Sequence, residues 1–122
     1  MSFPSIEPAR IILSTLSKYY SNFEREFVRF KWDLEYNATK RLLNTALYIS
    51  LRDMYTPHLM RFQNYAKLLQ EDFPYMSELQ YKKYKSILKD FDRVYLSISK
   101  EVSIIIEHFD CPERIRELLY YK

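Results

Sequence analysis

The chain has 122 residues, 48% of them hydrophobic and 29% charged, with a formal net charge of +3 and a sequence pI near 8.9. This composition excludes a wholly disordered chain and predicts one domain with a single hydrophobic core. The chain has no apolar run near the ~20 residues of a membrane-spanning helix, no signal-peptide pattern at its start and only one cysteine. We therefore expect a cytoplasmic protein without membrane contact, or one of the host cytoplasm if it is viral.

Glycine is absent from the chain, whereas tyrosine occurs 12 times and phenylalanine eight times. Without glycine, tight β-hairpin turns are costly and the glycine-rich loops that bind nucleotide phosphates are excluded. We therefore predict an all-α fold without a nucleotide cofactor: an elongated bundle of about five helices, two long and three short. The aromatic residues are expected to form the core. The alternative is that some tyrosines are exposed, where they stack on bases or fill an interface.

Local signals place a first helix at residues 8–20 and a long second helix at 22–55. The run Ser-Asn-Phe-Glu at 21–24 has the spacing of a capping box, which predicts a break between the two, with one continuous helix as the alternative. Pro57 predicts the end of the second helix, because proline lacks an N–H donor and restricts the residue before it. A short third helix is then predicted at residues 57–72.

The second long helix is predicted at residues 78–109, opened by a capping box in the run Ser-Glu-Leu-Gln at 77–80. Its apolar residues recur about every 3.5 positions and form a seam that faces neighbouring helices. The seam consists of Tyr81, Tyr84, Leu88, Phe91, Tyr95, Ile98, Val102, Ile105 and Phe109.

The helix predicted at residues 57–72 is only half as long as this seam and leaves part of it uncovered. We expect the remainder to be buried by the helix at 8–20, by a fifth helix at 111–121, by a second copy of the chain or by a protein partner. Dimerisation is therefore left open. The residues assigned to this interface are Tyr84, Phe91, Tyr95, Ile98, Val102 and Ile105.

A basic run in the same helix is the strongest local signal for binding. From Tyr81 to Lys89 the chain has four lysines and no acidic residue. Ammonium groups along one helix face would neutralise backbone phosphates of DNA or RNA with little sequence preference. The alternative is a solvated lysine face, interrupted by Asp90 and Asp92. The candidate nucleic-acid-binding residues are Lys82, Lys83, Lys85, Lys89 and Arg93. The candidates to extend this surface are Arg25, Arg29, Lys31, Trp32, Lys40 and Arg41.

Arg52 and His58 stand in the run Arg-Asp-Met-Tyr-Thr-Pro-His, which is similar to the motif of the HEPN ribonuclease family. Members of that family are small all-helical proteins that dimerise and bring two such motifs to one RNA strand. The resemblance implies that His58 would exchange the 2′-hydroxyl proton while Arg52 positions the phosphate. The alternative is a surface arginine and a histidine in the first turn of the third helix.

The only other histidine, His108, lies three residues before Cys111. A structural zinc site needs four ligands, and the sequence offers no second cluster of cysteine or histidine to complete one. We therefore expect neither a metal nor another cofactor, and Cys111 is interpreted as a packing residue rather than a nucleophile.

Three functions remain open from the sequence. The first is a non-enzymatic binding protein that associates with itself or with a protein partner and contacts nucleic acid through the basic helix face. By size, helicity and charge alone it looks like small ribonucleoprotein subunits or DNA-coating and accessory proteins of archaeal viruses. The second is a dimeric HEPN-like ribonuclease that uses Arg52 and His58. The third is an adaptor or inhibitor that binds only protein.

Overall fold

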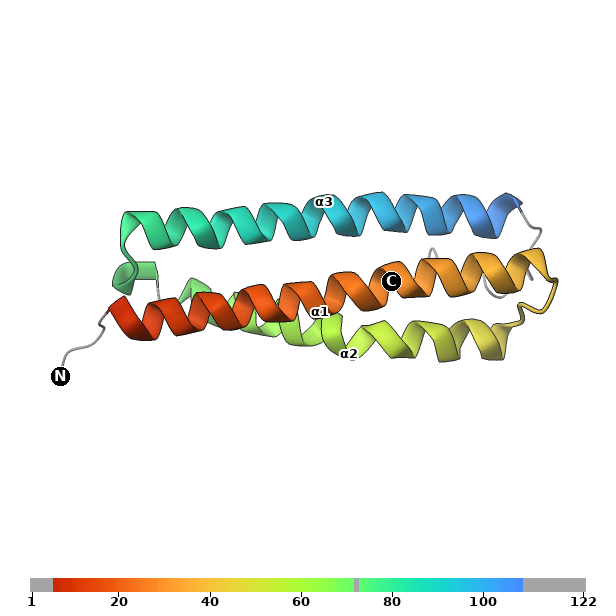
Figure 1. Ribbon diagram of the computed structural model, residues 1–122, viewed down its shortest axis with the longest axis horizontal. Helices are drawn as coiled ribbons and strands as arrows, with labels where there is room; N and C mark the ends of the chain where they lie inside the picture. The colour runs from red at the N-terminus through yellow and green to blue at the C-terminus, as the bar shows by residue number, and fades with distance from the viewer. Residues whose placement is uncertain (1–5, 72, 109–122) are drawn as a thin grey trace.

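The computed structural model describes residues 6–71 and 73–108. In this part of the chain three long helices form an all-α bundle, with one short 3-10 helix between the second and third and no strand. Their bounds are α1, Ile6–Thr39; α2, Thr45–Gln70; η1, Phe73–Tyr75; and α3, Glu78–His108. Figure 1 shows that α1 and α3 run in the same direction and α2 in the opposite one, along an elongated molecule. The all-α class predicted from the sequence is confirmed, whereas the helix count differs.

The predicted break at residues 21–24 is wrong, because α1 is one helix of 34 residues. Its buried stripe continues in register across this point, with Leu16 and Phe23 both fully buried. Fully burying a large apolar side chain stabilises by about 1.5–3 kcal/mol, more than the ~1 kcal/mol of a serine cap. Glu24 instead lies beside the Tyr20 hydroxyl, one turn back on the same helix.

The predicted helix at 22–55 is divided by a connection at residues 40–44. α1 ends in a Schellman motif, in which the Leu42 N–H donates to the Asn37 carbonyl at 2.9 Å and the Arg41 N–H to the Ala38 carbonyl at 3.1 Å. Arg41 has a positive φ of 59° in this motif. The next helix starts at Asn44, whose side chain accepts from the Leu47 N–H at 2.8 Å. Neither glycine nor proline marks this turn, so the sequence analysis missed it.

The predicted helix end at Pro57 is also wrong, since Pro57 lies inside α2. The proline removes one main-chain donor and its ring crowds the carbonyl of Asp53, four residues back, but the residue is exposed and disturbs no core contact. The Thr56 hydroxyl donates to the Arg52 carbonyl at 2.8 Å within the same turn. Buried residues on both sides, Tyr48 and Phe62, hold the helix against the bundle. The predicted helix at 57–72 is therefore the second half of α2.

The predicted helix at 78–109 corresponds to α3. The Ser77 N–H donates to the Gln80 side-chain oxygen at 2.9 Å, and the Gln80 N–H donates to the Ser77 hydroxyl at 3.2 Å. These reciprocal bonds are those of a capping box. The predicted helix at 111–121 lies outside the described residues.

The core is dominated by aromatic rings contributed by all three helices. Phe23 of α1 lies 5.1 Å from Phe91 of α3, and Phe91 lies 4.6 Å from Phe62 of α2, measured between ring centroids. Phe27 of α1 lies 4.7 Å from the Tyr55 ring of α2. Each such pair contributes about 0.5–1.5 kcal/mol beyond its buried area. These rings fill the space between the helices, whereas the helices of an alanine-rich bundle would lie closer together.

The three helices have 34, 26 and 31 residues, so they cover one another along most of their length. Buried residues of α3 extend from Tyr84 to Ile106. The expectation that a half-length neighbour leaves the seam uncovered is therefore wrong. Phe23 of α1 and Phe62 of α2 both pack against Phe91 of this seam.

Candidate nucleic-acid interface

The basic residues of α3 lie on the side of the helix opposite to its core residues. Lys82, Lys83, Lys85, Lys89, Arg93 and Lys100 are all exposed. Four of them are separated by seven, four and seven positions, a spacing that keeps them on one line along the helix. We call these four, Lys82, Lys89, Arg93 and Lys100, the basic row. At about 1.5 Å per residue the row extends over roughly 27 Å.

The two other predicted lysines flank the basic row. Each residue of an α-helix is rotated by about 100° around the axis from the one before it, so Lys83 points about 100° away from Lys82. The Lys85 ammonium lies 5.9 Å from the centroid of the Tyr81 ring, at the distance of a weak cation–π contact. The basic row therefore contains three of the five predicted site residues together with Lys100, which the spacing also placed on this face, and Lys83 lies at its edge.

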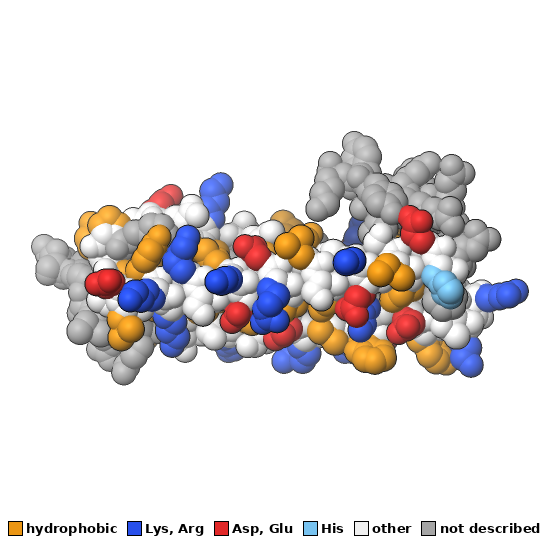
Figure 2. Space-filling model, turned by 90° about the horizontal axis from the view of Figure 1, so that it is seen from above, with side chains coloured by type: hydrophobic (Ala, Val, Ile, Leu, Met, Phe, Trp, Pro, Cys, Tyr) orange, Lys and Arg blue, Asp and Glu red, His pale blue; other side chains and the backbone are white. Residues whose placement is uncertain are grey.

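Acidic groups lower the local charge of this face. The Lys82 ammonium lies 3.9 Å from Glu78 and the Arg93 guanidinium 3.5 Å from Asp90, in pairs that are largely exposed. Such pairs contribute at most about 1 kcal/mol, so a phosphate group can replace the carboxylate. Within the described part of the chain no ion pair involves Lys89. Figure 2 views the molecule from the side of α3 and shows blue and red side chains interleaved along it.

The balance over this stretch is still positive. Between Tyr81 and Lys100 there are six basic and two acidic residues. Over the whole of α3 there are six basic and five acidic residues, because Glu78, Glu101 and Glu107 lie at the ends of the helix, so the positive charge is concentrated in its middle. The electrostatic potential of this face would attract a polyanion, with a strength that falls as salt is added.

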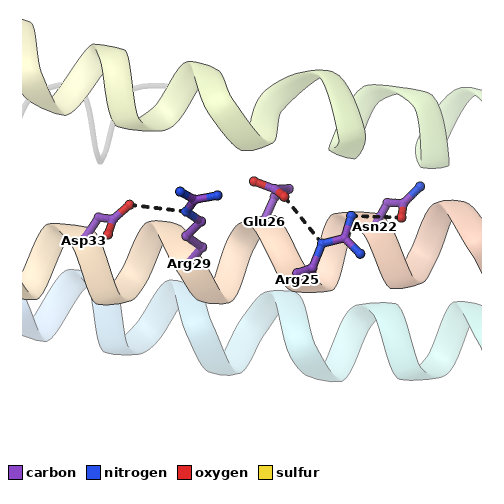
Figure 3. A network of polar contacts seen from close by, with 5 residues as sticks. All are labelled: Asn22, Arg25, Glu26, Arg29 and Asp33. Atoms are coloured by element: carbon purple, nitrogen blue, oxygen red, sulfur yellow. Dashed lines mark hydrogen bonds and ion pairs between the residues drawn. The ribbon is translucent and has the colours of Figure 1, made fainter.

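Of the residues proposed to extend the surface, Lys40 and Arg41 lie in the connection after α1 and the other four lie on α1. In Figure 3 the Arg25 guanidinium bonds to Asn22 at 3.2 Å and pairs with Glu26 at 3.5 Å, while Arg29 pairs with Asp33 at 3.9 Å. These side chains lie on the side of α1 toward α2. Their charges are therefore balanced by carboxylates of the same helix, and they do not continue the basic row.

Between α1 and α2 there is a shallow surface depression, lined by Glu26, Arg29, Phe30, Asp33, Leu51 and Met54. Its charged groups are the ones already paired in Figure 3. It contains no histidine, cysteine or hydroxyl group to act as a nucleophile or proton carrier. We therefore assign no chemistry to it.

Lys31, Trp32 and Lys40 lie near the carboxyl end of α1. The Lys31 ammonium lies 3.7 Å from Glu101 of α3 and 4.6 Å from the centroid of the Trp32 ring. Trp32 is 59% exposed, and Tyr36, four residues further on, is 61% exposed. The sequence analysis did not single out Tyr36, although its spacing from Trp32 and its place outside the buried stripe were visible.

Arg52 and His58 both lie on α2 and are both partly buried. Side chains six positions apart in a helix point about 120° apart around its axis, so the Arg52 and His58 side chains point in different directions. Arg52 lies close enough to the Tyr48 and Tyr55 hydroxyls to oppose the rise in their pKa. The Nδ1 atom of His58 is buried and has no hydrogen-bond partner. Within one chain the pair does not form a common site.

The seam residues predicted to form an interface lie inside the bundle. Tyr84, Phe91, Ile98, Val102 and Ile105 are each at most 8% exposed, and Tyr95 is partly buried against the Phe23 and Phe27 rings. In a single chain these six side chains contact α1 and α2. They are therefore not at the surface available to a partner.

Metal-binding clusters and membrane-spanning helices are both absent from the described residues. No group of three or more histidine, cysteine, aspartate or glutamate side chains is placed to hold a metal ion, and Cys111 lies outside this part of the chain. None of the helices described is both long and apolar enough to cross a membrane.

Comparison of the chain with protein-family models, with curated protein sequences and with solved structures found no match.

Proposed function

We propose that the protein is a non-enzymatic helical protein that binds the phosphate backbone of nucleic acid through the outer face of α3. The observation that carries the proposal is the basic row, four exposed cations on one line over roughly 27 Å. One strand of a duplex carries a phosphate about every 3.4 Å, so a row of this length runs beside about eight phosphates. The row is therefore long enough for each of its cations to meet a different phosphate.

The chemistry of this face favours binding without sequence reading. Lysine ammonium groups interact with phosphates as point charges and carry no information about the base. The outer face of α3 offers no asparagine or glutamine between Lys82 and Lys100 to read a base edge. The protein would then coat or package nucleic acid rather than recognise one site.

A salt titration with matched variants tests the proposal. The first variant replaces Lys82, Lys89 and Lys100 with glutamine. The control replaces Lys18, Arg61 and Lys67, exposed cations of α1 and α2, with glutamine, so that net charge changes equally. Each phosphate contact contributes about 0.9 to the slope of log K against log salt. We expect the α3 variant to lose two to three units of slope, in the range of about one per contact, and the control to keep its slope.

A stronger perturbation reverses the charge of the predicted site. Replacing Lys82, Lys83, Lys85 and Lys89 with glutamate is expected to abolish binding to DNA and RNA at low salt, measured by fluorescence anisotropy. An equal loss of salt slope in the α3 glutamine variant and in its control would mean that only the net charge of the protein matters. That result, or the absence of binding by the wild type at low salt, would refute the proposal.

The two other functions remain predictions. A HEPN-like ribonuclease would cleave single-stranded RNA, and a His58→Ala variant would lose that activity, whereas equal products from both proteins would exclude it. An adaptor would show no affinity for nucleic acid and one dominant partner in a pull-down from its own host. Self-association also remains a prediction, through a surface other than the buried seam.

A further inference from the structure

Two aromatic rings of α1 are exposed, while most rings of the bundle are packed. Trp32 is 59% exposed and Tyr36 61%, whereas Phe23 on the same helix is fully buried. Because they are four residues apart, the two lie on one face of α1, about one turn of ~5.4 Å from each other. Among the described residues neither ring contacts another ring. We call Trp32 and Tyr36 the exposed pair.

An ammonium group lies over one face of each ring of the exposed pair. The Lys31 Nζ lies 4.6 Å from the centroid of the Trp32 ring, and the Lys40 Nζ lies 5.9 Å from that of Tyr36. Lys31 is held in place by Glu101 of α3 at 3.7 Å, and its side chain is only 18% exposed. The indole is thus accompanied by a cation whose own position is restrained. Ring and cation together match the two parts of a nucleotide, its base and its phosphate.

We infer that the exposed pair is a stacking surface for single-stranded nucleic acid. Aromatic rings beside cations bind single strands because every base has a π-face that can stack and every nucleotide carries a phosphate. In a duplex both faces of each base are already stacked within the helix, so the pair gains nothing there. This inference rests on the proposed function and adds a preference for single strands, which the basic row by itself does not supply.

Charge argues for a nucleic acid over an apolar protein partner at this position. An apolar partner would have to desolvate Lys40 without supplying an anion, and an unpaired cation is costly to bury. A strand brings a phosphate to Lys40, whereas Lys31 already pairs with Glu101. A partner protein that used the exposed pair would compete with nucleic acid, so the same variants separate the two occupants.

Trp32 is the single tryptophan of the chain, so its fluorescence reports on this surface directly. We would titrate the full-length protein at low salt with oligodeoxythymidine and with a duplex of equal length. Stacking of a base on the indole is expected to quench the fluorescence with the single strand, in parallel with binding. The duplex is expected to bind through the basic row and to leave the fluorescence nearly unchanged.

Substitutions measure how much the pair contributes. Base stacking on one ring corresponds to about tenfold in affinity, so Trp32→Ala and Tyr36→Ala should each weaken single-strand binding by about that factor. Duplex binding should change less than twofold. Trp32→Phe, which keeps a ring, should retain most of the affinity. Met60→Ala removes a side chain that is 54% exposed on α2 and is the control for lost apolar surface.

The outcomes separate this inference from the proposed function. If the alanine variants bind both nucleic acids like the wild type while the α3 glutamine variant does not, the inference fails and the proposed function stands. If only the alanine variants lose single-strand binding, the inference holds and the role of α3 fails. Equal quenching by duplex and single strand would also overturn the inference, as would a wild type that binds neither.

Discussion

Tyr84 shows how a residue can belong to the core while its sequence neighbours belong to the surface. It stands between Lys83 and Lys85, both exposed, yet is only 1% exposed itself. Its hydroxyl donates to the Ala66 carbonyl of α2 at 2.9 Å. Such a bond contributes about 1 kcal/mol net, and here it ties α3 to α2. The basic run therefore supplies both a solvent face and an anchor to the bundle.

Buried tyrosines make the bundle sensitive to alkali. Burial, as the main cause, raises the pKa of Tyr20, Tyr48, Tyr55 and Tyr84 above the usual 10.0. Below pH 10 these groups are neutral in both the folded and the unfolded chain. Above it, the unfolded chain loses their protons first, so the folded state binds more protons and stability falls as pH rises.

We expect the free energy of unfolding in urea to be nearly constant between about pH 8 and 9 and to fall steadily above about pH 10. Tyr55→Phe, which removes the group with the largest rise in pKa, should make this fall less steep. Tyr36→Phe removes an exposed hydroxyl and should leave the slope unchanged. A stability that stays level through pH 11 would contradict the assignment of these tyrosines to the core.

At the scale of helices, the sequence analysis was right where local and long-range signals agreed. α3 has both a capping box at its start and an unbroken apolar stripe, and its predicted and observed bounds nearly coincide. At Ser21 and Pro57 a local stop signal opposed a continuing buried stripe, and the stripe prevailed. Burial depends on contacts between distant residues, which a local motif does not contain.

The opposite error occurred at the connection between α1 and α2. Residues 40–44 contain no glycine or proline, and Arg41 adopts the conformation that glycine usually supplies at this position. Asn44 was the available signal, since asparagine is among the preferred N-cap residues.

The candidate site was only partly predictable for a related reason. Spacing shows that Trp32 and Tyr36 lie off the buried stripe, but only the fold shows that their side chains are more than half exposed.

The Schellman motif at the end of α1 leads to a stability prediction. A residue with a Cβ pays about 1–2 kcal/mol for the left-handed conformation, and glycine avoids this cost but loses about 0.5–1 kcal/mol of chain entropy. Arg41→Gly should therefore raise the free energy of unfolding by about 0.5–1 kcal/mol. Arg41→Ala keeps the Cβ and is the control, with no expected gain. A destabilised glycine variant in urea melts would show that the Arg41 side chain stabilises the turn.

At the scale of the molecule, the three helices described have similar lengths and share one core. The seam is buried from Tyr84 to Ile106 by α1 and α2. The two surfaces that we propose for binding are the outer face of α3 and the exposed pair on α1. The ion pair between Lys31, which lies over the Trp32 ring, and Glu101 of α3 connects the helices that carry them.

Ile98→Asp distinguishes a core seam from an association seam. Ile98 is 8% exposed, and an unpaired carboxylate buried there should cost several kcal/mol, enough to unfold a domain of ordinary stability. We expect the variant to lose its helical circular dichroism, or to melt far below the wild type, at every protein concentration. Leu96→Asp, two residues away and 68% exposed, should melt like the wild type. If the seam instead joined two copies, the Ile98→Asp chain would stay folded and only its mass measured by light scattering would fall. That result would show that the seam is not buried within one chain.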